Sequence, residues 1–194
     1  MNRVLKAMVL FFILTGITWQ AVAFSEADLQ KLKSSLQCPK CDLAGADLSG
    51  AKLAGANLTY ANLDKARLFR AELAGANLSE ADLTGADLFN ADLTGADLSG
   101  TNLIDAYMED ANLQDANLAG ADLTQAYLEA TDLTGANLTQ TNFTGAFLEG
   151  VNLKNADLTD AVMTDTNLDG VKNLNTAILC RTTMPDSTVN NSGC

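Results

Sequence analysis

The four cysteines are the side chains of this 194-residue chain that are best suited to chemistry. Two of them lie in the run Cys38-Pro39-Lys40-Cys41, and two thiols at this spacing can exchange disulfides. A reactive cysteine is usually activated at the N-terminus of a helix, whereas Cys38 follows a predicted helix. The chain contains no His, which excludes a His-based triad and an imidazole general base. We therefore predict no enzymatic activity and no cofactor, and a thiol-disulfide redox response remains an alternative.

A repeat of five residues organises most of the chain. Leu recurs at every fifth position from Leu43 to Leu168, with Met108, Phe143 and Met163 as substitutes, and this makes 26 consecutive units. A small residue, usually Ala, stands two positions before each of these residues, and Asp or Asn mostly stands one position before. A period of five fits neither the stripe of a helix nor the alternation of a strand. The chain must therefore turn repeatedly to bring each Leu inward.

The units A-D-L-S-G (46–50), A-N-L-T-Y (56–60) and A-D-L-T-G (81–85) resemble the pentapeptide-repeat family, and the resemblance covers residues 42–171. It implies an all-β fold, a right-handed quadrilateral β-helix in which four pentapeptides form one square coil. The central Leu and the small residue point inward, and the other three residues point outward. Residues one coil apart then lie above one another, and the coils build a rod roughly 31 Å long at ~4.8 Å per coil.

The two ends of the repeat differ from its middle. Residues 24–41 are predicted to form a short N-terminal capping helix and the Cys-x-x-Cys segment, because they contain a capping-box-like start and one apolar helical face. The positions concerned are Ser25, Asp28, Leu29, Leu32 and Leu36. The repeat decays at Asn173, and residues 172–194 are expected to form a C-terminal cap and a loose tail. Such caps would shield the unpaired ends of the rod.

The N-terminus predicts export. Residues 1–23 contain two cations, an apolar run at 7–17 and the sequence A-V-A at 21–23, which are the parts of a cleavable signal peptide. The run is too short for a membrane span, so no stable membrane insertion is expected after cleavage. The formal net charge of -12 argues against binding to nucleic acid.

The rod implied by the resemblance also sorts the cysteines. It places Cys38 and Cys41 at one end and Cys180 and Cys194 at the other, roughly 30 Å away by the same spacing of coils. A disulfide needs Cα atoms within about 7 Å, so each cysteine can pair only with its neighbour at the same end. The same separation excludes a single zinc site with four cysteines. Export makes two structural disulfides the favoured interpretation.

One of the four implied faces departs from the Asp and Asn pattern. On one other face acid and amide residues alternate, and on a second no two acids are adjacent, so we expect the side chains of these two faces to hydrogen-bond between coils. The exceptional face collects most of the aromatic residues and two arginines. We predict it as a surface for a protein partner, with stabilisation of the coil by stacked rings as the alternative. Its residues are Arg67, Phe69, Arg70, Phe89, Tyr107, Tyr127 and Phe147.

A strip of stacked acids lies beside those rings. It comprises Glu109, Glu129, Glu149 and Asp169. Neighbouring carboxylates repel, so these side chains should splay apart, take up protons at a raised pKa or bind a cation. We predict no metal site, and the strip is the one candidate for weak binding of a divalent cation such as Ca²⁺.

Two main classes of function follow. The first is an exported, non-catalytic protein that presents a rigid acidic β-helix to an unidentified protein partner. The run L-Q-C-P-K-C at 36–41 and the ending L-C-R-T-T-M-P-D at 179–186 resemble exported cyanobacterial and plant thylakoid-lumen members of the family, which implies the thylakoid lumen or the periplasm. The alternative is a DNA mimic, similar to the family members that bind DNA gyrase. The sequence predicts no oligomeric state.

Overall fold

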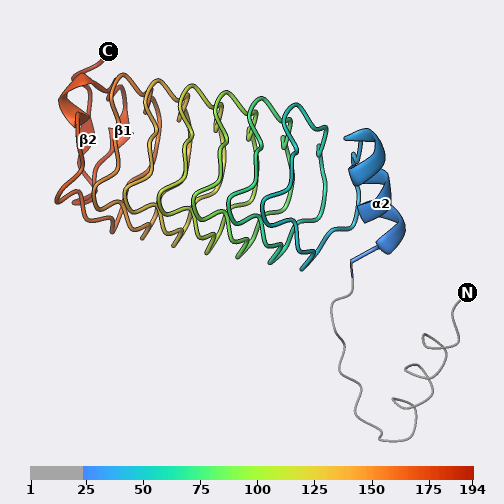
Figure 1. The fold of residues 1–194 in the computed structure, drawn as a ribbon. Coiled ribbons are helices and arrows are strands. Elements are labelled where there is room, and N and C mark those ends of the chain that lie inside the picture. Colours follow the sequence, from blue (N-terminus) through green and yellow to red (C-terminus); the bar gives the residue numbers. More distant parts are fainter. Residues whose placement is uncertain (1–23) are drawn as a thin grey trace, which may run out of the picture.

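The computed structural model describes residues 24–194, and the predicted signal peptide at 1–23 lies outside this range. A stack of similar coils forms an elongated rod between two different ends (Figure 1). Helix α2, Glu26–Ser35, lies at one end, and the 3-10 helix η1, Leu174–Thr176, lies towards the other with strands β1, Thr182–Thr183, and β2, Val189–Asn190. None of the helices in residues 24–194 is long and apolar enough to cross a membrane.

The coils are joined by parallel bridges between residues 20 positions apart, from Gln37↔Asn57 to Asn152↔Lys172. Four five-residue units therefore complete one coil, as the repeat predicts. Each face pairs through a single residue because turns precede and follow it, so the ladder consists of isolated bridges rather than long strands. The bonds are nevertheless short: the Leu63 N–H donates to the Asp82 carbonyl at 2.7 Å, and the Lys65 N–H donates to the Thr84 carbonyl at 2.8 Å.

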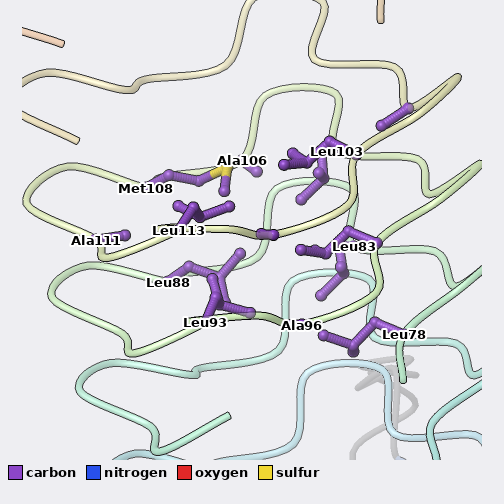
Figure 2. Close-up of a cluster of buried hydrophobic side chains, with 14 of the residues drawn as sticks. Leu78, Leu83, Leu88, Leu93, Ala96, Leu103, Ala106, Met108, Ala111 and Leu113 are labelled. Atoms are coloured by element: carbon purple, nitrogen blue, oxygen red, sulfur yellow. The ribbon is translucent and has the colours of Figure 1, made fainter. Parts of the chain in front are cut away.

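The core consists of the central residues and the small residues two positions before them (Figure 2). Ala and Leu at these positions are almost completely buried, and the three substitutes Met108, Phe143 and Met163 are also buried. Threonines in the small position donate their hydroxyls to backbone carbonyls, either of the preceding unit, as Thr101 does to Leu98 at 2.7 Å, or of the coil below. The Thr131 hydroxyl donates to the Met108 carbonyl at 2.8 Å, and the Thr141 hydroxyl donates to the Leu118 carbonyl at 2.9 Å. A polar residue is thus tolerated in the core.

Outward Asp and Asn side chains accept hydrogen bonds from backbone N–H groups that have no partner in the ladder between coils. In most units their Oδ1 atom accepts from the N–H two residues later, as Asp87 does from Phe89 at 3.1 Å. Amides also donate to the coil below: Asn142 Nδ2 lies 3.2 Å from Asp122 Oδ1, and Asn137 Nδ2 lies 2.9 Å from Asn117 Oδ1. The expected hydrogen bonding between coils is confirmed at these positions.

Helix α2 is tied to the first coil. The Ser25 hydroxyl accepts from the Asp28 N–H at 3.2 Å, and Asp28 Oδ2 accepts from the Asp42 N–H at 3.0 Å. Leu29 and Leu32 are buried against the core, with exposed fractions of 6% and 0%. The helix therefore begins at the predicted polar residues and buries Leu29 and Leu32, whereas Leu36, predicted on the same face, is its left-handed C-cap and only partly buried.

The C-terminal end continues the ladder beyond residue 171, where the sequence pattern ends. Asn173 adopts a left-handed conformation (φ 59°), and η1 follows it. Bridges then join residues 21 positions apart, Asp157↔Ile178 and Val162↔Thr183, while Leu179 is buried like a central Leu. One extra residue has shifted the frame, so the units 177–181 and 182–186 were missed. Strands β1 and β2 pair antiparallel in the segment predicted to be a loose tail.

Both predicted disulfides are present. The Cα atoms of Cys38 and Cys41 are 5.3 Å apart, and those of Cys180 and Cys194 are 4.7 Å apart. The first pair is inaccessible, because Cys38 is 0% and Cys41 is 2% exposed. In the second pair Cys180 is half-buried and Cys194 is exposed.

Candidate protein-binding face

Five aromatic side chains form two stacks on one face of the rod, which we call the aromatic face. Phe69 and Phe89 lie with ring centroids 5.9 Å apart and planes 8° from parallel. Tyr107, Tyr127 and Phe147 form the longer stack, with centroid distances of 5.0 and 4.8 Å. Consecutive residues of this stack are partners in the bridge ladder, so the backbone sets the spacing of the rings.

The longer stack is open to solvent at its two ends. Tyr107 is 46% exposed and Phe147 is 44% exposed, whereas Tyr127 is half-buried between them. Rings held in this way lose little conformational freedom when a partner covers them, because the stack already fixes them. The rings stack, as the alternative of ladder stabilisation requires, and Tyr107 and Phe147 still expose surface that a partner can cover.

The glutamates beside the longer stack replace a missing hydrogen-bond acceptor. Tyr107 occupies a position where most units carry Asp or Asn, and its ring offers no oxygen to the N–H of Glu109. Its own backbone N–H instead lies near the carboxylate of Glu109 and lowers the pKa of that group. Glu129 and Glu149 stand in the same relation to Tyr127 and Phe147. Three consecutive coils therefore carry an aromatic residue followed two positions later by a glutamate.

Burial raises the pKa of the Glu109 carboxyl, and the charges of Glu129, Asp87 and Asp110 raise it further, while its own N–H lowers it. The Oε2 atoms of Glu109 and Glu129 are shielded from solvent and have no hydrogen-bond partner within residues 24–194. The surroundings of these glutamates are thus acidic, and two carboxylate oxygens lack a hydrogen-bond donor. It favours a partner that supplies positive charge or hydrogen-bond donors.

Two shallow hollows flank Tyr107. One, of about 490 Å³, is lined by Phe69, Gly85, Asp87, Phe89, Tyr107 and Glu109. The other, of about 450 Å³, is lined by Lys65, Thr84, Gly85, Asp105, Tyr107 and Tyr127. Gly85 borders both because it has no side chain to fill the corner between them. Together they surround one exposed ring with apolar walls and carboxylates, which suits a side chain that is apolar along its stem and cationic at its tip.

The two arginines of the predicted face are already engaged. Arg67 Nη1 lies 3.1 Å from Asp47 Oδ2, and both side chains are mostly exposed. The guanidinium of Arg70 lies over the ring of Phe69, 4.9 Å from its centroid. These contacts place the positive charge at the end of the face nearer helix α2. The part around the longer stack keeps its acidic character.

The family model described as pentapeptide repeats (8 copies) matches residues 40–68, 66–105, 111–150 and 136–172. The chain belongs to the pentapeptide-repeat family. Proteins of this family fold as right-handed quadrilateral β-helices, which agrees with the coils described above. No curated protein sequence matches this chain.

Solved structures of other pentapeptide-repeat proteins are similar to it. QnrB1, a plasmid-mediated fluoroquinolone resistance protein, is 24% identical over 65% of this chain and 76% of its own, with a TM-score of 0.50. HetL from the cyanobacterium Nostoc sp. strain PCC 7120 is 26% identical over 79% and 81%, with a TM-score of 0.44. A thylakoid-lumen protein of Arabidopsis thaliana is 32% identical over 51% and 68%, with a TM-score of 0.36.

The structure divides the predicted acidic strip of this pentapeptide-repeat protein. Asp169 is exposed, and its N–H donates to Asn167 Oδ1 at 2.9 Å, so its carboxylate is not required as an acceptor. Within residues 24–194 no group of three or more acidic or cysteine side chains is arranged to hold a metal ion. The pairing of each aromatic residue with the glutamate two positions later was missed, although three consecutive coils display it in the sequence.

Proposed function

We propose that this pentapeptide-repeat protein is a non-catalytic binding protein whose aromatic face docks a protein partner. The observation that carries the proposal is the stack of Tyr107, Tyr127 and Phe147, which is exposed at both ends. Exposed aromatic residues with fixed positions are the usual anchors of protein interfaces. Coils above and below hold each ring through the ladder, so the face is organised before binding.

The charges and rings of the aromatic face indicate which side chains a partner should present. Carboxylates of Asp87 and Glu109 adjoin the rings, and the net charge of the chain is -12. A partner with basic side chains beside apolar or aromatic ones would complement both properties. The acidic surface disfavours nucleic acid as the ligand.

We further propose that the protein acts after export, in the thylakoid lumen or the periplasm. The predicted signal peptide and the two disulfides support this location, since disulfides persist in oxidising compartments. The similarity to a thylakoid-lumen protein of Arabidopsis is compatible with it. In this compartment helix α2 would serve as a cap that prevents end-to-end association of rods.

The two sequence alternatives have less support. A DNA mimic would present an acidic surface in place of phosphates, and the two aromatic stacks interrupt that surface. The likeness to QnrB1 concerns the fold. A redox role for Cys38 and Cys41 would require access to sulfur atoms that the first coil and helix α2 bury. Fractionation of cells separates the first alternative, because a processed form in the cytoplasm would favour mimicry over export.

The test is capture of the partner from the exported compartment with the wild-type protein and with the variant Tyr107→Asn/Tyr127→Asn/Phe147→Asn. Asn is chosen because Asn117 and Asn137 already stack in this position on another face, with a hydrogen bond of 2.9 Å. The variant should keep its circular dichroism spectrum and lose the captured protein. Equal capture by both proteins would contradict the proposal.

A further inference from the structure

The two disulfides differ in their access to solvent. The sulfur atoms of Cys38 and Cys41 belong to side chains that are at most 2% exposed, and Cys38 Sγ lies 3.2 Å from the Asp28 carbonyl oxygen of helix α2. Cys194 is exposed at the other end of the rod, and Cys180 is half-buried. Thiol-disulfide exchange requires an in-line approach of a thiolate to one sulfur, so access decides which disulfide reacts.

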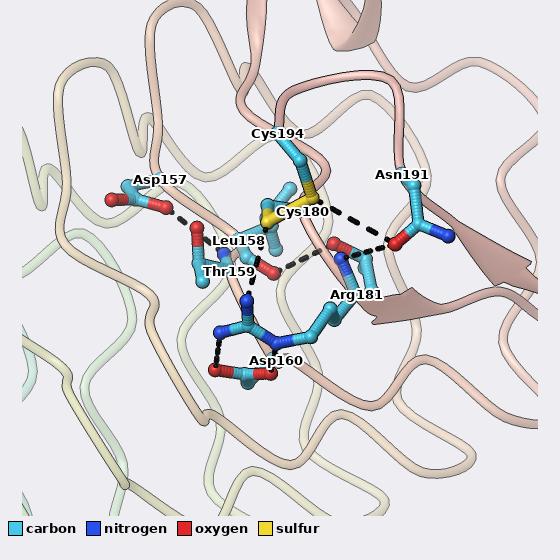
Figure 3. A network of polar contacts seen from close by, with 9 residues as sticks. Asp157, Leu158, Thr159, Asp160, Cys180, Arg181, Asn191 and Cys194 are labelled. Atoms are coloured by element: carbon cyan, nitrogen blue, oxygen red, sulfur yellow. Dashed lines mark hydrogen bonds and ion pairs between the residues drawn. A yellow bond between two sulfur atoms is a disulfide. The ribbon is translucent and has the colours of Figure 1, made fainter.

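The surroundings of Cys180 favour its departure as a thiolate (Figure 3). Arg181 uses Nε and Nη2 to bind the carboxylate of Asp160, at 2.6 and 2.5 Å. Its remaining nitrogen, Nη1, lies 3.6 Å from the Sγ atom of Cys180. The ion pair thus holds a donor and a positive charge beside a sulfur that would become negative. Cys41 also has a cationic neighbour, because Lys31 Nζ lies 3.9 Å from its Sγ atom, so the contrast between the two disulfides rests mainly on access to solvent.

Few noncovalent contacts hold the segment that the disulfide fastens. Strand β2 pairs with β1 through Thr182↔Asn190 and Thr183↔Val189. Asn191 Oδ1 accepts from the Arg181 N–H at 3.2 Å, and Gly193 packs so closely on Ile178 and Leu179 that a Cβ would lie 2.6 Å from the Leu179 nitrogen. Val189 is 56% exposed. The segment therefore depends on its covalent link.

We propose that Cys180–Cys194 is a thiol-disulfide exchange site for a dithiol reductant, and that its reduction releases residues 187–194 from the last coil. A thiolate of the reductant attacks the exposed Sγ of Cys194, forms a mixed disulfide and expels Cys180 as a thiolate beside Arg181. The second thiol of the reductant then breaks the mixed disulfide and leaves as an intramolecular disulfide. Two electrons and two protons pass to this chain, which ends with two thiols, while the reductant is oxidised. Release exposes the backbone edge of β1 and the apolar Leu179.

The test follows reduction of the folded protein by dithiothreitol, with free thiols alkylated at intervals and located by mass spectrometry. Cys180 and Cys194 should be modified at least about tenfold faster than Cys38 and Cys41, because only the former are accessible. In denaturant the two rates should converge. Equal rates in the folded protein, or faster reaction of Cys38 and Cys41, would overturn the proposal.

Two further measurements separate its parts. Arg181→Gln should slow reduction of Cys180–Cys194 by roughly threefold or more. The matched variant Asp160→Asn keeps the guanidinium charge and an Oδ1 acceptor for Arg181 Nε, so it should not slow the reaction. An unchanged rate in Arg181→Gln would refute the role of the guanidinium. The variant Cys180→Ser/Cys194→Ser should show faster hydrogen exchange at residues 182–191 and unchanged exchange at residues 57–142. Unchanged exchange at 182–191 would refute the release.

Discussion

The Asp and Asn faces of the rod and its aromatic face solve the same problem in different ways. Each unit leaves one backbone N–H without a partner in the ladder. On the regular faces an Asp or Asn oxygen accepts from it, as Asn142 Oδ1 does from the Thr144 N–H at 3.1 Å. In the Tyr107 unit the ring takes the place of that residue, and the N–H of Glu109 interacts instead with its own carboxylate, whose pKa it lowers.

This difference shows how a repeat can acquire a binding surface without losing its ladder. Moving the acceptor from one outward position to the other frees the first position for a large side chain. The cost falls on Glu109 and Glu129, which are partly buried and whose Oε2 atoms have no hydrogen-bond partner within residues 24–194, whereas Glu149 is exposed. The regular faces therefore contribute mainly to stability, whereas the aromatic face contributes less to stability and exposes its rings to a partner. Substitutions on the two kinds of face should therefore lower the free energy of unfolding by different amounts.

The largest effect on stability is expected on a regular face. Asn142 donates to Asp122 Oδ1 at 3.2 Å and to Thr124 Oγ1 at 2.9 Å, and it accepts from Thr144. Asn142→Leu should lower the free energy of unfolding by about 2 kcal/mol, because it leaves these half-buried groups unpaired. The matched change Tyr127→Leu should cost only about 1 kcal/mol, the value of ring stacking. Denaturant titration would measure both, and a larger loss in Tyr127→Leu would reverse the comparison.

A smaller effect tests the pairing of aromatic and acidic residues. Glu109→Ala removes the acceptor for its own N–H and should cost about 1 kcal/mol. Adding Tyr107→Asn should restore most of that loss, because Asn can accept from the same N–H, so the double-mutant cycle should show a coupling of about 1 kcal/mol.

The control for this cycle is Asp169→Ala. The N–H of Asp169 already donates to Asn167 Oδ1 at 2.9 Å, so this change should leave stability nearly unaffected. Additive effects of Tyr107→Asn and Glu109→Ala would show that Glu109 does not replace the missing Asp or Asn.

The smallest effect is a dependence of stability on pH. Burial, followed by the charges of Glu129, Asp87 and Asp110, raises the pKa of Glu109 in the folded state. A raised carboxyl pKa favours the protonated form on folding, so stability should rise slightly as the pH falls through that pKa towards its ordinary value. At lower pH the trend should reverse, because hydrogen bonds hold the pKa values of Asp47, Asp160 and Asp186 below their usual range. Thermal melts of wild type and Glu109→Gln would measure the difference, and identical profiles would contradict this assignment.

The regular part of the fold could be predicted because every unit repeats one physical requirement. A central Leu and a small residue must point inward in each unit, so an unbroken period of five leaves little choice of architecture. The polar start and apolar face of helix α2 could be predicted for a similar reason, since Ser25, Asp28 and Leu32 stand at fixed helical spacing.

The C-terminal coil, the exposure of the disulfides and the roles of the acids depend on tertiary packing, which the five-residue period does not describe. The extra residue at Asn173 places A-I-L-C-R at 177–181 out of phase, and only the bridges Asp157↔Ile178 and Val162↔Thr183 reveal that the ladder continues. The sequence likewise predicts no difference in solvent exposure between the two disulfides, whereas packing buries Cys38–Cys41 and leaves Cys194 exposed. The acids of the strip looked equivalent, yet Asn167 relieves Asp169 of the role that Glu109 has.

The most direct test of the central claim is photocrosslinking in the exported compartment. A photoreactive phenylalanine derivative at Tyr107 would probe the aromatic face, and the same residue at the exposed Glu72 would probe an adjacent face. The account predicts one crosslinked protein partner from position 107 and none from position 72. Crosslinks of equal yield from both positions, or from position 72 alone, would contradict the assignment of the aromatic face as the binding surface.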